Sequence, residues 1–139
     1  MSPAQPLPNF FIVGAPKAGT TSLYHHLDQH PQIYMSPLKE PCYFSSELRP
    51  ENYTEELQPW ITREIQALQQ YLAGPMTEKR FGGLVSEWDD YIKLFRNAAG
   101  AHTIGEASVC YLWSPIMDLS VWLRRTSRVA GEGPWVFRS

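Results

Sequence analysis

The segment from residue 10 to residue 23 contains residue types that bind phosphate groups, at a spacing that suits this chemistry. It reads Phe10-Phe-Ile-Val-Gly-Ala-Pro-Lys-Ala-Gly-Thr-Thr-Ser-Leu23. Gly14 and Gly19 have the G-x-x-x-x-G spacing of a loop whose backbone N–H groups can turn toward an anion. A helix that begins near Thr20 would add free amides and its positive dipole end. The residues expected to bind the anion are Gly14, Ala15, Pro16, Lys17, Ala18, Gly19, Thr20, Thr21 and Ser22.

The position of the lysine in this loop indicates which anion chemistry is expected. A nucleoside triphosphatase loop continues after its second glycine with Lys-Ser or Lys-Thr, and that hydroxyl holds Mg²⁺. Here Thr20 follows Gly19, and the lysine lies inside the loop as Lys17. We therefore expect one fixed cation facing the bound group, with a catalytic role for Lys17 where negative charge develops on a leaving oxygen. No metal site is expected.

The hydroxyl residues after the loop have a second interpretation. Ser and Thr commonly cap the first turn of a helix, so Thr20, Thr21 and Ser22 could serve only as N-caps. Three hydroxyls in succession exceed what one cap needs, which favours a binding role.

At this point the sequence resembles the sulfotransferases that use 3′-phosphoadenylyl sulfate, whose loop has the form Pro-Lys-x-Gly-Thr-[Thr/Ser]-[Ser/Ala]-Leu. The resemblance continues in register over roughly the first 115 residues and is strongest to the heparan-type and bacterial branch. Its further motifs are His30-Pro31, Ile33, Lys39-Glu-Pro-Cys-Tyr-Phe44 and Gly105-Glu-Ala-Ser-Val-Cys-Tyr-Leu112. It implies sulfuryl transfer from 3′-phosphoadenylyl sulfate as co-substrate to a hydroxyl or amine on a small-molecule or carbohydrate acceptor.

The resemblance also implies roles for individual residues. It places Glu40 against the acceptor hydroxyl as a catalytic general base, and Pro41 predicts an extended backbone at Glu40. An exposed loop glutamate paired with Lys39 is the alternative, and Lys39 itself could contact substrate or be a surface lysine. His25, His26 and His30 are interpreted as structural.

The expected fold class is α/β, a P-loop-type parallel sheet flanked by helices. The continuous apolar run that ends at Gly14 is typical of an interior parallel strand. In such sheets, sites form at the carboxyl ends of strands. Leu23 and Leu27 are expected to share the buried face of the first helix, and Ser86 to cap a later one. The expected elements are strands at 10–13, 32–35 and 102–106, helices at 20–29 and 86–99, an ordered loop at 36–44, and one or two surface helices within 49–72.

The domain interpretation divides the chain at Pro115. Residues 1–115 match the N-terminal part of a sulfotransferase domain, whereas 116–139 form an atypical tail that does not match the family. The Arg-x-Pro-x-x-Arg-x-x-Ser element that holds the 3′-phosphate in the family does not occur in these 139 residues. We therefore expect an incomplete domain, with the chain as given acting as an inactive fragment.

Composition limits the classes of partner. The formal charge of −2 and the pI near 6.1 argue against a basic nucleic-acid-binding surface. Cys42 and Cys110 have no metal-site or disulfide-framework spacing, so two reduced, half-buried thiols are expected. The proline-rich N-terminus does not resemble a signal or membrane segment, which predicts a cytoplasmic protein without membrane contact. The oligomeric state does not follow from the sequence.

Two other functions remain open from the residues alone. One is a P-loop nucleotide triphosphatase or kinase with a deviant loop, which would need an acidic strand end to hold Mg²⁺. The other is a non-catalytic anion-binding module that retains only the cradle.

Overall fold

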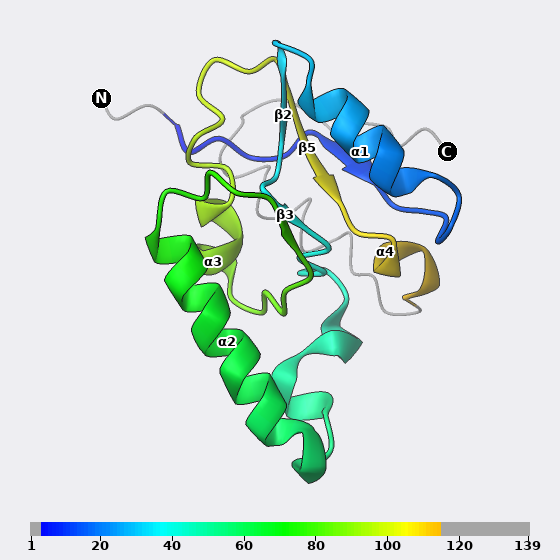
Figure 1. The fold of residues 1–139 in the computed structure, drawn as a ribbon, viewed down its shortest axis with the longest axis vertical. Helices are drawn as coiled ribbons and strands as arrows, with labels where there is room; N and C mark the ends of the chain where they lie inside the picture. The colour runs from blue at the N-terminus through cyan, green and yellow to red at the C-terminus, as the bar shows by residue number, and fades with distance from the viewer. Residues whose placement is uncertain (1–3, 115–139) are drawn as a thin grey trace.

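The computed structural model describes residues 4–114. A three-stranded parallel sheet in the order β1-β5-β2 forms its centre, with β1 at Phe10–Ile12, β5 at Thr103–Ala107 and β2 at Ile33–Met35 (Figure 1). Phe10 pairs with Gly105 at one side of β5, and Met35 pairs with the same glycine at the other side. The predicted parallel arrangement of the strands is confirmed, and β5 is the central strand.

One face of the sheet is covered by α1 (Thr20–Asp28), which begins directly after the candidate loop. Side chains alternate between the two faces along each strand, and Ile12, Met35 and Ala107 point to this face, where they pack with Tyr24 of α1. The contact holds the start of α1 next to the sheet.

The other face carries the larger core. Phe11, Tyr34 and Ile104 contribute to it from the strands, and Tyr91 and Phe95 meet them from α3 and the residues that follow it. Because both faces are covered, β1 and β2 read as the apolar runs typical of a parallel sheet, whereas β5 also contains Thr103 and Glu106.

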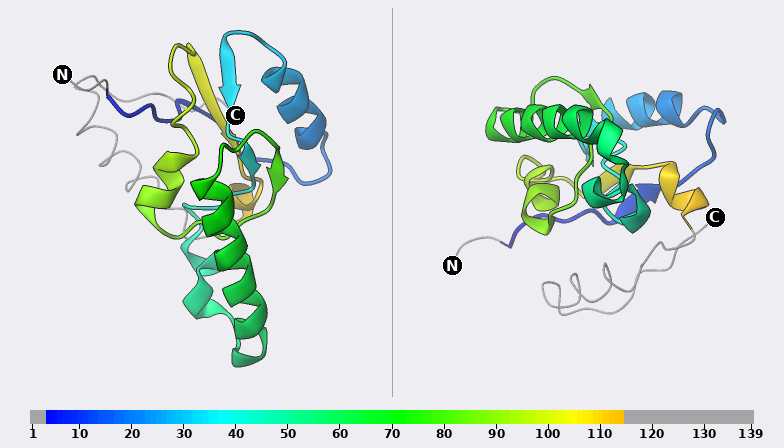
Figure 2. Two further views of the ribbon diagram at one scale, coloured as in Figure 1. Left: turned by 60° about the vertical axis from the view of Figure 1, so that its left-hand side comes forward. Right: turned by 90° about the horizontal axis from the view of Figure 1, so that it is seen from below.

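The remaining elements lie around this core. Figure 2 shows α2 projecting away from the sheet, and within residues 4–114 no helix is both long and apolar enough to cross a membrane. These elements are β3 (Leu38–Lys39), three 3-10 helices (η1, Ser46–Leu48; η2, Pro50–Asn52; η3, Glu55–Leu57), α2 (Gln58–Ala73), β4 (Arg80–Phe81), α3 (Trp88–Lys93) and α4 (Cys110–Trp113).

Two details of the first and third helices differ from the prediction. Leu23 is 45% exposed, whereas Tyr24 is 1% exposed and donates a hydrogen bond to the Ser36 carbonyl, 2.6 Å away. The buried face of α1 is therefore turned by one residue. In α3, Glu87 occupies the N-cap position and no side chain caps the helix, so Ser86 does not have the expected role.

Two predicted boundaries also change. The segment expected to be a loop at 36–44 contains β3, which pairs in parallel with β4. The region of 49–72, where one or two surface helices were expected, contains most of α2, and Pro59 lies in its first turn, where a missing N–H costs nothing. The predicted tail at 116–139 lies outside the described residues.

Candidate functional site

The candidate anion loop lies between the carboxyl end of β1 and the start of α1. Residues 15–19 are exposed, and the Ala18 N–H donates to the Ala15 carbonyl to close a turn at the loop's centre. Lys17 has a positive φ of 59°. The loop therefore presents its lysine from an exposed turn at the end of β1.

The start of α1 remains open to a ligand. Its N-cap is Gly19, no side chain caps the helix, and the first turn carries no acidic residue. The Leu23 N–H donates to the Gly19 carbonyl as the first helical hydrogen bond. The amides of Thr20, Thr21 and Ser22 thus belong to the part of a helix that lacks backbone partners. The alternative in which these hydroxyls only cap the helix is contradicted.

The two glycines of the loop have different physical roles. Gly19 has a φ of +83° and open space around the position of a Cβ, so its backbone conformation favours glycine. A Cβ on Gly14 would lie 2.6 Å from Leu112 Cδ2, so Gly14 allows close packing against α4. This packing places the loop after β1 beside the turn after β5.

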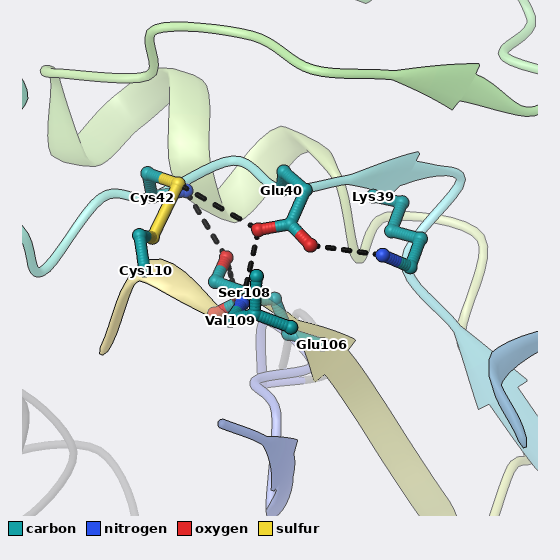
Figure 3. Close-up of polar contacts among 7 residues, drawn as sticks. All are labelled: Lys39, Glu40, Cys42, Glu106, Ser108, Val109 and Cys110. Carbon is teal, nitrogen blue, oxygen red and sulfur yellow. Dashed lines mark hydrogen bonds and ion pairs between the residues drawn. A yellow bond between two sulfur atoms is a disulfide. The ribbon is translucent and has the colours of Figure 1, made fainter. Parts of the chain in front are cut away.

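Glu40, the predicted base, is held at the carboxyl end of β5. Its backbone N–H donates to the Ala107 carbonyl at 2.8 Å. The Val109 N–H donates to Glu40 Oε2 at 2.9 Å, and Lys39 Nζ lies 2.8 Å from Oε1 (Figure 3). The carboxylate is 19% exposed, so it is oriented by the protein and still reachable.

The backbone around Glu40 differs from the prediction. Glu40 has a φ of +63° and Cys42 a φ of +53°, on either side of Pro41. The expected extended conformation of Glu40 is therefore wrong. Non-glycine residues in this region persist where surrounding contacts fix them, and such residues cluster at functional sites.

Lys39 is a buried residue rather than a surface lysine. Its side chain is 3% exposed, and Nζ lies 4.6 Å from the centre of the Phe81 ring. Burying an ammonium group is costly unless it is paired. The Glu40 carboxylate is that partner, so the alternative in which both residues form a solvated surface pair is wrong.

Cys42 and Cys110 form a disulfide, which corrects the expectation of two reduced thiols. The bond joins the turn after β3 to the start of α4 across 68 residues of sequence. Cys42 Sγ lies 4.0 Å from Glu40 Oε2. The side chains of Glu40, Cys42 and Cys110 form a cluster of metal-ligand type, but disulfide sulfurs are not the thiolates that metals bind.

Glu106 is an additional polar residue of this site, and sequence reasoning gave it no role. Its side chain is fully buried and accepts hydrogen bonds from the hydroxyls of Tyr91, at 2.7 Å, Tyr111, at 3.1 Å, and Ser108. Burial raises the pKa of Glu106 to about 7, and the three hydroxyl donors partly oppose this effect. Its sequence signal is an acidic residue inside an otherwise apolar strand.

The structure brings the two halves of the predicted site to one edge of the sheet. Lys17 follows β1, Glu40 is bonded to the end of β5, and these two strands are neighbours. His25 and His26 lie exposed on α1, and His30 Nδ1 accepts a hydrogen bond from the Gln32 N–H. The arrangement can bind an anion at one strand end and accept a proton at the next.

Comparisons with known proteins agree with this geometry. A family model described as the sulfotransferase family matches residues 8–104. Carbohydrate sulfotransferase 15 of Homo sapiens is 49% identical over 39 residues, which are 28% of this chain and 7% of that protein. Membrane-associated sulfotransferase kil1 of Dictyostelium discoideum is 50% identical over 40 residues, which are 29% of this chain and 8% of that protein.

A solved structure gives the same result for the fold. The crystal structure of a sulfotransferase from Alicyclobacillus acidocaldarius matches with a TM-score of 0.56 and 34% identity. The match covers 88% of this chain and 40% of that chain. The chain thus spans less than half of the solved protein and less than a tenth of the curated relatives in the matched regions.

Proposed function

Because this chain belongs to the sulfotransferase family, we propose that it binds 3′-phosphoadenylyl sulfate and serves sulfuryl transfer to a hydroxyl or amine. The observation that carries the proposal is the uncapped start of α1 after a lysine-bearing loop, at the sheet edge where Glu40 is held. Amides of an open helix start and one cation suit the 5′-phosphosulfate of the donor.

Lys17 acts on the leaving group in this proposal. The acceptor oxygen or nitrogen forms a bond to sulfur, and the bond between sulfur and the bridging oxygen breaks. That oxygen stays on the 5′-phosphate, where negative charge increases. A fixed ammonium beside the oxygen stabilises the charge as the bond breaks, which lowers the barrier.

Glu40 acts on the acceptor. The proton of the acceptor hydroxyl or amine moves to the carboxylate as the new bond to sulfur forms. The Val109 N–H and Lys39 Nζ hold one carboxylate oxygen each, so the remaining lone pairs have a fixed direction. Positioning of this kind contributes much of the rate in group-transfer reactions of related type.

The acceptor class is a small molecule or a carbohydrate in this proposal. Support for a carbohydrate comes from the name of one matched relative, carbohydrate sulfotransferase 15. Whether the 139 residues alone transfer sulfate is a separate matter, and the expectation of an inactive fragment stays a prediction. A radiolabelled transfer assay across phenols, sugars and amines tests both.

Thermal-shift measurements test the proposal at the level of binding. Adenosine 3′,5′-bisphosphate is expected to stabilise the chain more than ATP with Mg²⁺. At a hundred times its dissociation constant, a ligand adds about 2.7 kcal/mol to the free energy of unfolding. Equal or greater stabilisation by ATP with Mg²⁺ would favour the nucleotide triphosphatase alternative. Binding without transfer in a full-length relative carrying this loop would favour the anion-binding module.

A further inference from the structure

The Glu106 carboxylate lies in the protein interior, where loss of hydration makes a charged group costly. It is fully buried, and among the described residues no cation is paired with it. Its partners are three hydroxyl groups, that of Tyr91 on α3 and those of Ser108 and Tyr111 in the segment after β5. An apolar residue of similar size would avoid the desolvation penalty, so fold stability alone does not explain a glutamate here.

The three partners of Glu106 do not have the same surroundings. Tyr91 and Tyr111 are core residues, and burial raises the pKa of each above the ordinary value of 10, so both remain protonated donors. Ser108 connects the carboxylate to the turn around Glu40. The Ser108 hydroxyl donates a hydrogen bond to Glu106 Oε1, and the same oxygen accepts a hydrogen bond from the Cys42 N–H at 3.1 Å.

This connection extends to Glu40 through the backbone. Ser108 and Val109 are consecutive residues, and both are bonded to the same turn. The Ser108 Oγ accepts the Cys42 N–H, and the Val109 N–H donates to the Glu40 carboxylate. The turn has positive φ angles at Glu40 and Cys42 and needs such contacts to persist. Figure 3 shows Ser108 and Glu106 below Glu40, with Lys39 on one side of the Glu40 carboxylate and the disulfide on the other.

We propose that Glu106 and Ser108 are positioning residues that hold the Glu40–Cys42 turn in its left-handed conformation and so orient the Glu40 carboxylate. Glu106 accepts the Ser108 hydroxyl hydrogen, which leaves the Ser108 lone pairs directed at the Cys42 amide. The two residues touch neither donor nor acceptor in this scheme. The proposal rests on the proposed function for the role of Glu40, whereas the contacts it describes are independent of that role.

Residue-resolved amide hydrogen exchange of the 139-residue chain tests the proposal. In Ser108→Ala, exchange of the Cys42 amide is expected to become about tenfold faster, because the loss of one buried hydrogen bond corresponds to roughly this factor. The Val109 amide signal is expected to shift as the Glu40 carboxylate moves. Glu106→Gln should change both amides in the same direction, because its new NH₂ group competes for the Ser108 lone pairs.

Two further variants separate positioning from general loss of structure. Tyr91→Phe removes another hydroxyl from the same carboxylate, and Tyr91 donates from α3 to Glu106 Oε2 rather than to Ser108 or Cys42, so Cys42 exchange should stay as in the wild type. Ser108→Thr keeps the hydroxyl and should restore protection. Amides within α2 report the global stability of the fold in every variant. Their exchange rates should change, if at all, by one common factor.

The outcomes are distinct. Wild-type exchange at Cys42 in Ser108→Ala would overturn the proposal, and so would an equal increase in Tyr91→Phe. If Cys42 exchange is faster in Ser108→Ala but stays at the wild-type rate in Glu106→Gln, then Ser108 positions the turn and Glu106 does not. Adenosine 3′,5′-bisphosphate is titrated into the same samples. Absence of binding to the wild type would count against the proposed function and leave the exchange result valid.

Discussion

The backbone N–H of Val109 donates a hydrogen bond to the Glu40 carboxylate at 2.9 Å, across 69 residues of sequence. Val109 lies at the end of the central strand, in the turn that leads to α4, and Leu112 of α4 packs against Gly14 of the anion loop. One short segment after β5 therefore touches both halves of the candidate site. Changes in it should affect the Lys17 side and the Glu40 side together.

Lys17 and Glu40 are expected to divide donor binding and proton transfer between them. Lys17→Ala should weaken binding of adenosine 3′,5′-bisphosphate by about tenfold to a hundredfold, the usual effect of losing one charge-assisted hydrogen bond. Glu40→Gln should leave this affinity unchanged and remove any transfer. Isothermal titration calorimetry on the 139-residue chain measures the first effect. The radiolabelled transfer assay measures the second in a full-length relative that carries the same loop and the same Lys-Glu-Pro-Cys segment.

Lys93→Ala is the matched control for loss of a positive charge, because Lys93 is exposed and paired with Asp90 on α3. Its affinity for the nucleotide should equal that of the wild type. If Lys93→Ala and Lys17→Ala weaken binding equally, net charge rather than the loop explains the effect. Full transfer by Glu40→Gln would return His25, His26 and His30 to consideration as the base.

The disulfide is expected to stabilise the fold. Closing a loop of 68 residues restricts the unfolded chain, and the chain-entropy treatment gives roughly 4 kcal/mol for this length. Reduction should lower the free energy of unfolding by up to this amount, as measured by urea denaturation with and without a phosphine reductant. The Cys42→Ser variant should show the lower stability in both conditions. A reductant effect that persists in Cys42→Ser would contradict the assignment.

The redox state in cells is informative about location. Structural disulfides persist mainly in oxidising compartments, whereas the sequence favoured a cytoplasmic protein. Alkylation of Cys42 and Cys110 in intact cells, followed by mass spectrometry, would test that prediction. Blocked cysteines, with no label incorporated before reduction, would count against the cytoplasm.

The parts of the fold that the sequence predicted depend on neighbouring residues. The apolar run before Gly14 and the spacing of Gly14, Lys17 and Gly19 predicted β1, the loop and α1, because strand, turn and helix start are all determined locally. The strand predicted at 102–106 was also inferred from neighbouring residues. These elements account for the sheet and for the anion half of the site.

The parts that the sequence did not predict depend on contacts between distant residues. The pairing of Cys42 with Cys110, the left-handed backbone of Glu40 and the burial of Lys39 all result from the approach of the turn after β3 to the end of β5. The spacing of these residues along the sequence does not indicate that the two segments lie close together. In α1, Tyr24 replaced Leu23 as the buried residue because its hydroxyl reaches the Ser36 carbonyl.

Gly105 is expected to be required by packing in the middle of β5. A Cβ at this position would lie 2.5 Å from Met35 Sδ and 2.8 Å from Phe10 Cδ1, on the two neighbouring strands. Gly105→Ala should therefore lower the free energy of unfolding by about 1–3 kcal/mol, the usual cost of overpacking a core. Gly74→Ala is the control, because a Cβ there makes ordinary contacts of 3.5 Å or more. Equal urea midpoints for Gly105→Ala and the wild type would contradict this explanation.

Glu106 is expected to make the stability of the chain depend on pH. Burial raises its pKa from the ordinary 4.5 to about 7, while Tyr91, Ser108 and Tyr111 partly oppose the shift and Glu40 adds to it. Between these two pH values the folded state holds more protons than the unfolded state, so the contribution of Glu106 to stability falls as pH rises. Below pH 4.5 both states are protonated and the penalty is absent. Above pH 7 it is complete, at about 3 kcal/mol, since one pKa unit corresponds to roughly 1.4 kcal/mol.

Glu106→Gln isolates this contribution from those of the other titrating groups. Glutamine stays neutral, so the variant should match the wild type near pH 4 and exceed its free energy of unfolding by up to about 3 kcal/mol near pH 8. Urea denaturation across this range, plotted as the difference between variant and wild type, gives the measurement. A difference that is constant with pH would mean that Glu106 titrates normally in the fold. A rising difference together with faster Cys42 exchange would show that the glutamate lowers global stability while it holds the turn that carries Glu40.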